Sequence, residues 1–266
     1  MTGQAAVTVD GAVARVGFLN PDQGFMDRAM EDALVAAVDR IEADPAIRAV
    51  VLTGDAPGVF IRHYDIKPLS AQAASLRERG RTFSEDRPLR EAGIHTATRR
   101  IEESGRIWIA ALNGTAMGGG FELALACDIR LVQAGDHRFG LPEVNLAIMP
   151  GAGGTQRLPR LVGASRALML TLTGDTITPA QMVDWGLAMD VVPDAKAAAM
   201  SLAARIARRS PRALRHIKSM VRRSAASDPA LLAIERTLFC DLMVQDEGIA
   251  LMAEAAAGRR SITDEP

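Results

Sequence analysis

The sequence predicts an α/β fold that ends in a helical C-terminal region. Short runs of alternating or continuous apolar residues, typical of strands, are interspersed with stretches in which apolar residues recur at helical spacing. From about residue 195 onwards the pattern is helical. We therefore divide the 266-residue chain into an α/β core, residues 1–195, and a helical region, residues 196–266.

The N-terminal part of the core contains a hairpin, a helix and a strand. The runs AAVTVD and VARVGFL flank Asp10-Gly11, which favours a tight hairpin turn. Beyond Asp27 the period changes to that of a helix, which ends at ADP. The apolar residues at helical spacing are Met30, Leu34, Val38 and Ile41. The run AVVLTG then predicts a buried strand that closes at Gly54.

The middle of the chain mixes strands with irregular segments. The polar stretch from Ser70 to Gly93 is rich in Arg, Glu and Ser and lacks a firm apolar face, so it fits both a mobile loop and a frayed helix. IWIAALNG predicts a strand that ends in a turn, and DIRLV predicts another. Later in the chain LAMDVV predicts one more strand, among helices over residues 164–172, 179–185, 195–209, 211–224 and 229–258.

Composition narrows the class of protein. The 31 basic and 32 acidic residues give a net charge of −1, so no global field attracts nucleic acid. The N-terminus lacks the pattern of a signal peptide, and no apolar run approaches the roughly 20 residues that span a bilayer, so we expect a cytoplasmic protein without membrane contact. No CxxC or HxxxH spacing suggests a metal, and Cys127 fits a buried hydrophobe better than a nucleophile.

Three consecutive glycines, Gly118 to Gly120, precede a helix that carries a lone acid, Glu122. The first N–H groups of a helix lack intrahelical partners, and glycine lets a ligand oxygen approach them. The run therefore fits a phosphate cradle or an oxyanion hole, although tight packing of helix on strand explains it equally well. It matches neither a P-loop nor a dinucleotide fingerprint.

A second acid, Glu143, follows a proline in the apolar segment FGLPEVNLAIMPGAGGTQR. Apolar surroundings raise the pKa of a carboxyl group, which suits proton transfer near neutral pH. Two glutamates beside one backbone anion site could add water to, or remove it from, a molecule next to a carbonyl. A solvent-facing acid at the end of a strand is an equally good interpretation of Glu143 alone.

Two motifs together carry a more specific signal. GTAMGGGFELALACDIRLV followed by FGLPEVNLAIMPGAGGTQRL resembles the signature of the crotonase superfamily, the enoyl-CoA hydratase/isomerase family. The likeness extends to FLNP…AVVLTGDAPGVFIRHYDI and to ERTLFCDLMVQDEGIALMAEAAAGRR, so it covers nearly the whole chain. It implies a spiral of ββα turns, with the active site in residues 1–195, and a helical C-terminal trimerisation region, residues 196–266, that also covers the site.

The resemblance also implies roles for individual residues. The N–H groups of Gly119 and Tyr64 would form the oxyanion hole for a thioester carbonyl. Glu122 would hold and activate a water molecule, and Glu143 would exchange the proton at the α-carbon. The residues implied in substrate binding are Ile61, Arg62, His63, Asp65, Ile66, Gly118, Gly151 and Lys218.

Some of these positions depart from the family or have a second explanation. Arg62, His63 and Tyr64 stand where family members usually carry small residues, which reshapes the entrance to the site. Lys218 would offer its charge to coenzyme A phosphates, but it also fits the solvated face of an amphipathic helix. The stretch from Ser70 to Gly93 would be a lid that selects the acyl chain, or a disordered segment.

The implied activity is the reversible hydration of a 2-enoyl-CoA thioester, without metal or redox cofactor and with coenzyme A as part of the substrate. The implied assembly is a homotrimer or a hexamer formed by two trimers. Other enolate reactions of the same scaffold stay open: isomerisation, thioester hydrolysis and carbon–carbon hydrolysis. A non-catalytic scaffold or RNA-binding protein is disfavoured because both acids are present and the net charge is near zero.

Overall fold

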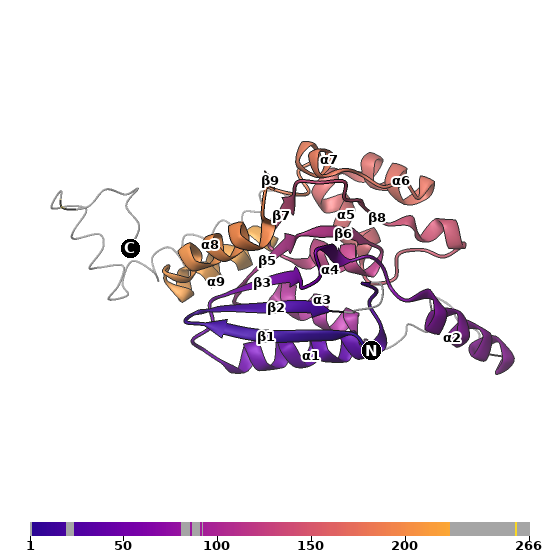
Figure 1. The fold of residues 1–266 in the computed structure, drawn as a ribbon, viewed down its shortest axis with the longest axis horizontal. Helices are drawn as coiled ribbons and strands as arrows, with labels where there is room; N and C mark the ends of the chain where they lie inside the picture. Colours follow the sequence, from indigo (N-terminus) through magenta and orange to yellow (C-terminus); the bar gives the residue numbers. More distant parts are fainter. Residues whose placement is uncertain are drawn as a thin grey trace.

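The described residues form two β-sheets with helices packed around them (Figure 1). The structure, a computed structural model, describes residues 2–19, 24–80, 86, 91, 93–223 and 259. Strands and helices alternate through the core, which confirms the predicted α/β class. The helix predicted over residues 229–258 lies outside the described residues. The division at residue 195 stays a prediction, because most of residues 196–266 lie there too.

The larger sheet has six strands in the order β1-β2-β3-β5-β7-β9. They are β1 Gln4–Asp10, β2 Val13–Leu19, β3 Ala49–Gly54, β5 Ile107–Leu112, β7 Ile129–Gln133 and β9 Val191–Val192. β1 and β2 form the predicted antiparallel hairpin, and all other pairs are parallel. Its turn lies one residue later than predicted, at Gly11-Ala12, because Asp10 pairs with Val13 and Gly11 has a φ of +54°.

The smaller sheet has three parallel strands, β4 Gly58–Ile61, β6 Gly114–Met117 and β8 Phe139–Gly140. Along the chain each follows a strand of the larger sheet, so β3-β4, β5-β6 and β7-β8 are successive pairs. Helices follow each pair, which produces repeated ββα turns stacked along the two sheets. This stacking agrees with the spiral implied by the resemblance.

The described helices include those predicted from apolar spacing after Asp27 and over residues 164–172, 179–185, 195–209 and 211–224, and two that were not predicted, over residues 94–103 and 154–162. They are α1 Arg28–Ala43, α2 Ile66–Glu78, α3 Ile94–Glu103, α4 Gly119–Ala126, the 3-10 helix η1 Pro142–Leu146, α5 Gly154–Val162, α6 Ala164–Thr173, α7 Pro179–Asp184, α8 Ala195–Ala207 and α9 Pro211–Arg223. α1 begins as predicted, because the Asp27 side chain accepts a hydrogen bond from the Met30 N–H. Its four predicted apolar residues are all buried.

The first part of the polar Ser70–Gly93 stretch belongs to α2, which starts earlier than predicted, at Ile66. Figure 1 shows α2 projecting away from the sheets, and none of its residues is buried. This exposure explains why the stretch has no apolar face. Residues 81–85, 87–90 and 92 lie outside the described residues, so its proposed role as a lid stays a prediction.

The larger sheet is buried on both faces. In β5, Trp108 and Ala110 belong to a core shared with α1, α3 and α4, whereas Ile107 and Ile109 belong to a second cluster on the opposite face. Four alanines of α8 cover that second face: Ala195, Ala199, Ala203 and Ala207. Because small side chains let the helix approach closely, α8 packs directly on the sheet and is part of the core of the fold.

Candidate active site

The three glycines at the start of α4 have different structural reasons. Gly118 has a φ of +49°, a conformation that side chains with a Cβ rarely adopt. A Cβ on Gly120 would lie 2.3 Å from the Ile61 carbonyl oxygen, so β4 packs against it too closely for alanine. A Cβ on Gly119 would meet only Ile94 Cδ1, at 3.5 Å. Backbone conformation therefore explains Gly118 and tight packing explains Gly120, but neither explains the middle glycine, Gly119.

The N–H groups of Tyr64 and Gly119 have no partner among the hydrogen bonds of the described residues. The N–H of Met26 donates to the carbonyl of His63 at 2.9 Å, and the N–H of Asp65 donates to the carbonyl of Met26 at 2.7 Å. Because this is a parallel bridge between Met26 and Tyr64, the N–H of Tyr64 points away from Met26. Two backbone donors are thus left available, one from Tyr64 in the turn after β4 and one from Gly119, the first residue of α4.

Glu122 lies on the first turn of α4 and is almost completely buried. Its Oε1 accepts hydrogen bonds from the N–H groups of Ala152, at 2.8 Å, and Gly154, at 2.7 Å. Burial raises the pKa of Glu122 above its usual value, while these two bonds and the charge of Arg157 act in the opposite direction. One carboxyl oxygen is therefore fixed by the backbone in a mostly apolar environment.

Glu143 lies in η1, and its environment differs from that of Glu122. Its Oε2 is buried and has no hydrogen-bond partner among the described residues. Burial, with a smaller contribution from the neighbouring charge of Glu122, raises the pKa of Glu143 to about 7. A carboxyl group with this pKa exchanges protons readily at neutral pH.

Both acids and both backbone donors face one cavity of about 610 Å³. The sequence-predicted site residues that line it are His63, Tyr64, Ile66, Gly118, Gly119, Glu122, Glu143 and Gly151. The rest of the lining is largely apolar, with Leu69, Ile94, Leu146, Ile148 and Met149 among it. An apolar cavity with a few convergent polar groups is the usual form of a small-molecule site.

Three predicted residues beside Tyr64 are placed elsewhere. Ile61 is fully buried in the core, where its carbonyl and side chain pack on Gly120. Asp65 caps α2, accepting a hydrogen bond from the Lys67 N–H at 3.0 Å. Arg62 is exposed, and its backbone joins the segment at Gly24 to the end of β6. Ile61, Arg62 and Asp65 therefore shape the Tyr64 turn without lining the cavity.

The predicted role of Lys218 in binding coenzyme A is not supported by its position. Its ammonium group is buried and donates to the carbonyls of Ile101 and Arg106, both at 2.9 Å. It also pairs with Asp128 at 2.9 Å. Since α3 ends at Glu103, the lysine binds near a helix C-terminus, where a cation is favoured. The correction is that Lys218 ties α9 to α3 and lies outside the cavity.

Comparison with known proteins agrees with this geometry. The enoyl-CoA hydratase/isomerase family model matches residues 8–257. The chain belongs to this family. The probable enoyl-CoA hydratase echA8 of Mycobacterium leprae (strain TN) is 37% identical over 265 residues, covering 94% of this chain and 96% of that protein. The 2,3-dehydroadipyl-CoA hydratase of Escherichia coli (strain K12) is 38% identical over 226 residues, covering 84% and 83%.

Solved structures superpose on nearly the full length of the chain. An enoyl-CoA hydratase from Bacillus anthracis gives a TM-score of 0.81 with 28% identity, covering 98% of this chain and 99% of that one. DspI from Pseudomonas aeruginosa gives a TM-score of 0.82 with 30% identity, covering 96% and 95%. These likenesses confirm the fold that the resemblance implied.

Glu31 and His95 are among the polar residues that line the cavity and were not predicted from the sequence. Glu31 is buried on α1, and its Oε1 accepts from the N–H of Ile94 at 3.4 Å. His95 is exposed on α3, and its Nε2 contacts the carbonyl of Gly151 at 2.7 Å. Burial, followed by the negative charge of Glu31, raises the pKa of the Tyr64 phenol to about 12.

One signal in the sequence points to Glu31. It lies three residues before Leu34, on the apolar face of its helix, where an acid is unexpected. His95 carries no such signal.

We searched the described residues for a metal-binding cluster and for a membrane-spanning helix. Within those residues, no group of His, Cys, Asp and Glu is placed to hold a metal ion. Likewise, none of the described helices has the length and apolarity needed to cross a bilayer. Cys127 is buried and unpaired, as predicted, and burial raises the pKa of its thiol to about 12.

Proposed function

We propose that this protein hydrates 2-enoyl-CoA thioesters to 3-hydroxyacyl-CoA thioesters. The observation that carries the proposal is the pairing of two unlike acids in one cavity. The Glu122 carboxylate is fixed by two N–H groups, whereas a buried oxygen of Glu143 has no partner among the described residues. Hydration needs one group to hold water and another to deliver a proton, and these two acids suit those tasks.

The reaction follows from this arrangement. The thioester carbonyl oxygen accepts hydrogen bonds from the N–H groups of Tyr64 and Gly119, which stabilise the enolate. Glu122 orients a water molecule and takes its proton as the water oxygen bonds to C3. Glu143, protonated in part at neutral pH because its pKa is about 7, gives a proton to C2. Proton exchange with solvent then restores both acids, so the net change is the addition of one water.

Isomerisation, the nearest alternative, needs proton exchange at one acid only. The hydrogen bonds that hold Glu122 in the cavity have no purpose in that scheme, so they favour hydration. The proposed reaction uses no redox cofactor, and coenzyme A enters as part of the substrate.

We also propose a homotrimer or a hexamer of two trimers, in the cytoplasm. Apolar side chains are exposed on two helices, Leu168, Met169 and Leu172 on α6 and Ile217 and Val221 on α9. Exposed apolar faces of this kind are typical of protein–protein contacts. Gel filtration with light scattering measures the assembly directly, and a monomer at micromolar concentration would contradict it.

The function is tested by the ultraviolet absorbance of the conjugated enoyl thioester. Short, medium and aromatic enoyl-CoA substrates are compared in the wild type, Glu122→Gln and Glu143→Gln. We expect rapid loss of absorbance in the wild type and strong reduction in both variants, with far-ultraviolet circular dichroism unchanged. Release of free coenzyme A without hydration of any substrate would show a thioester hydrolase instead.

A further inference from the structure

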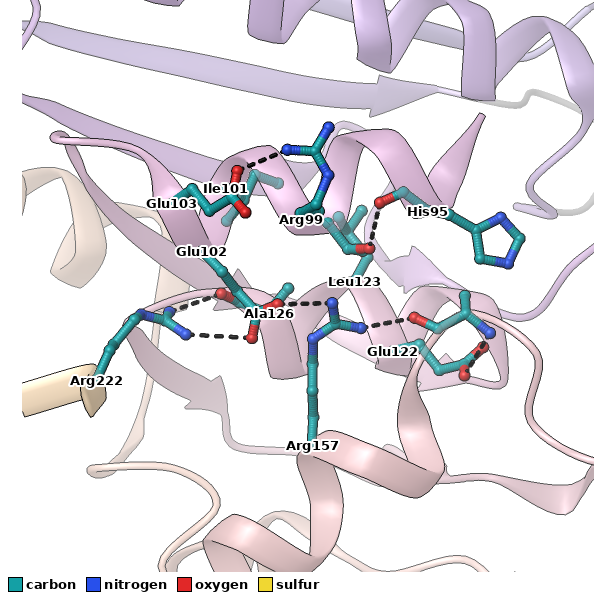
Figure 2. A network of polar contacts seen from close by, with 12 residues as sticks. His95, Arg99, Ile101, Glu102, Glu103, Glu122, Leu123, Ala126, Arg157 and Arg222 are labelled. Carbon is teal, nitrogen blue, oxygen red and sulfur yellow. Dashed lines mark hydrogen bonds and ion pairs between the residues drawn. The ribbon is translucent and has the colours of Figure 1, made fainter. Parts of the chain in front are cut away.

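We propose that Arg157 is a positioning residue for Glu122, held in place by Glu102 and, through it, by Arg222 of α9. This inference rests on the proposed function, because it assigns a residue that prepares the water-holding acid. Figure 2 shows polar contacts that link Arg222, Glu102 and Arg157, and the backbone of Ala152 joins Arg157 to Glu122. The three outer residues lie outside the lining of the catalytic cavity.

The first step concerns the turn that holds Glu122. Both hydrogen bonds to its Oε1 come from this turn, from the N–H groups of Ala152 and Gly154. A Cβ on Gly154 would lie 3.0 Å from Glu122 Oε1, so the turn packs directly on the carboxylate. The position of the carboxylate therefore depends on the position of the turn.

The second step concerns the other side of the same turn. Arg157 Nη1 donates to the carbonyl of Ala152 at 2.6 Å, so Ala152 bonds to Glu122 through its N–H and to Arg157 through its carbonyl. Gly153 has a φ of +98°, and a Cβ there would lie 2.1 Å from Arg157 Nη1. The guanidinium group thus packs directly against the turn that holds Glu122.

The third step is the support of Arg157 itself. Its Nη2 donates to Glu102 Oε2 at 2.7 Å, and only 11% of its side chain is exposed. The other oxygen of Glu102 accepts from Arg222 Nη1 at 3.3 Å. Arg222 Nη2 also donates to the carbonyl of Ala126, the last residue of α4, at 2.8 Å, and to Asp128 Oδ1, just before β7, at 2.7 Å. A planar guanidinium with several fixed partners is a rigid support.

Charge gives Arg157 a second effect on the site. The charged and titratable groups that act on Glu122 are Arg157 from α5, His95 from α3 and Glu143 from η1. Arg157 and His95 favour the ionised form of Glu122, against the effect of burial. Loss of the Arg157 cation should therefore leave Glu122 protonated up to a higher pH.

The test compares Arg157→Gln, Arg157→Lys and a matched control, Arg160→Gln, which removes an exposed arginine from the same helix. For Arg157→Gln we expect kcat to fall by about 10- to 100-fold while KM changes by less than about threefold, because the turn shifts but the cavity wall does not. The acid limb of the kcat–pH profile should move up by about one pH unit. Arg157→Lys should keep the acid limb near the wild type, because the positive charge is retained. Its kcat should still fall about tenfold, because an ammonium group cannot reproduce the two-pronged geometry of the guanidinium. Arg160→Gln should match the wild type.

A second readout does not depend on activity. The infrared band of protonated Glu122 is isolated by subtracting the spectrum of the Glu122→Gln variant from that of the protein with Glu122 intact. The band is followed against pH in the wild-type background and in the Arg157→Gln background. A titration of Glu122 that moves upward in Arg157→Gln supports the proposal even if the wild type hydrates no substrate. An unmoved titration, or a kcat loss equal to that of Arg160→Gln, would overturn it. If Arg157→Gln does not fold, an Arg157→Lys variant with the wild-type kcat would overturn the proposal.

Discussion

Glu122 and Glu143 share a cavity but are held in opposite ways. Glu122 lies on a helix inside the core, and the backbone of a neighbouring turn binds one of its oxygens. Glu143 lies on a short 3-10 helix, and its buried Oε2 lacks a partner among the described residues. An acid that must orient water benefits from fixed geometry, whereas an acid that must transfer a proton benefits from a pKa near neutrality. The two environments thus fit two different tasks.

The separate roles of Glu122 and Glu143 are tested most directly by replacing each acid with its amide. We expect kcat to fall by about 10²- to 10⁴-fold in both Glu122→Gln and Glu143→Gln, because each removes a group that transfers or holds a proton. Stopped-flow absorbance of an enoyl thioester measures both. If Glu143 alone mattered, Glu122→Gln would stay within a few-fold of the wild type, and the water-holding role would be wrong.

The second prediction concerns the stability of Glu143→Gln at alkaline pH. The folded pKa of Glu143, about 7, is raised above the usual value of 4.5. The folded state therefore binds more protons than the unfolded state between these values, so stability falls as pH rises through this window. We expect Glu143→Gln to be more stable than the wild type by about 1 to 3 kcal/mol at pH 9 and equal to it near pH 4.

Urea unfolding at both pH values measures this difference. Glu122→Gln is measured in the same way for comparison, because its amide oxygen can still accept the hydrogen bonds from the N–H groups of Ala152 and Gly154. A Glu143→Gln protein that is less stable than the wild type at pH 9 would show that the carboxylate has a stabilising partner in the folded protein.

The sequence was sufficient to predict the acids and the glycine-led helix, because those features are local. The apolar setting of Glu143 predicted its raised pKa. A free N–H follows from the position at a helix start, and the glycines leave it accessible. It was not sufficient for Lys218, whose partners Ile101 and Arg106 are more than a hundred residues away. Hydrophobic periodicity places a residue on a helix face, but not the element that this face meets.

The same limit explains the missed link between Arg157 and Glu122. In the sequence AGGTQR the arginine follows a pair of glycines, and nothing around Glu102 indicates that the two side chains will pair. Only the folding of three separate segments brings α3, α5 and α9 together. Long-range polar contacts of this kind are not encoded in any single stretch of the chain.

The third prediction concerns two glycines, Gly118 beside Glu143 and Gly154 beside Glu122. A Cβ on Gly118 would lie 3.0 Å from Glu143 Oε1, and a Cβ on Gly154 would lie 3.0 Å from Glu122 Oε1. We expect each alanine variant to lose about tenfold in kcat by displacing its own carboxylate. Gly118→Ala should also cost about 1 to 2 kcal/mol of stability, because its φ is +49°.

The pH profiles distinguish the two variants. Gly118→Ala should alter the limb due to Glu143, near pH 7, whereas Gly154→Ala should alter the limb due to Glu122. Gly119→Ala is the control for the fold, since its Cβ meets only Ile94 at 3.5 Å, and it should unfold at nearly the wild-type urea concentration. Identical pH profiles for Gly118→Ala and Gly154→Ala would mean that the two acids titrate as one coupled pair.

The smallest expected effect belongs to the third acid of the cavity, Glu31. Burial raises its pKa, and its Oε1 accepts from the Ile94 N–H at the start of α3, where the N-cap Gly93 has no side chain to do so. Glu31→Gln keeps an acceptor oxygen for that N–H and removes the buried charge, so stability should rise by less than about 1 kcal/mol at pH 8. The gain should vanish as pH falls below the unfolded pKa, since the wild-type carboxyl is then neutral in both states. Asp32→Asn, which removes an exposed carboxylate from the same helix, is the control. A loss of more than about 2 kcal/mol in Glu31→Gln would instead show that the negative charge itself holds the start of α3 in place.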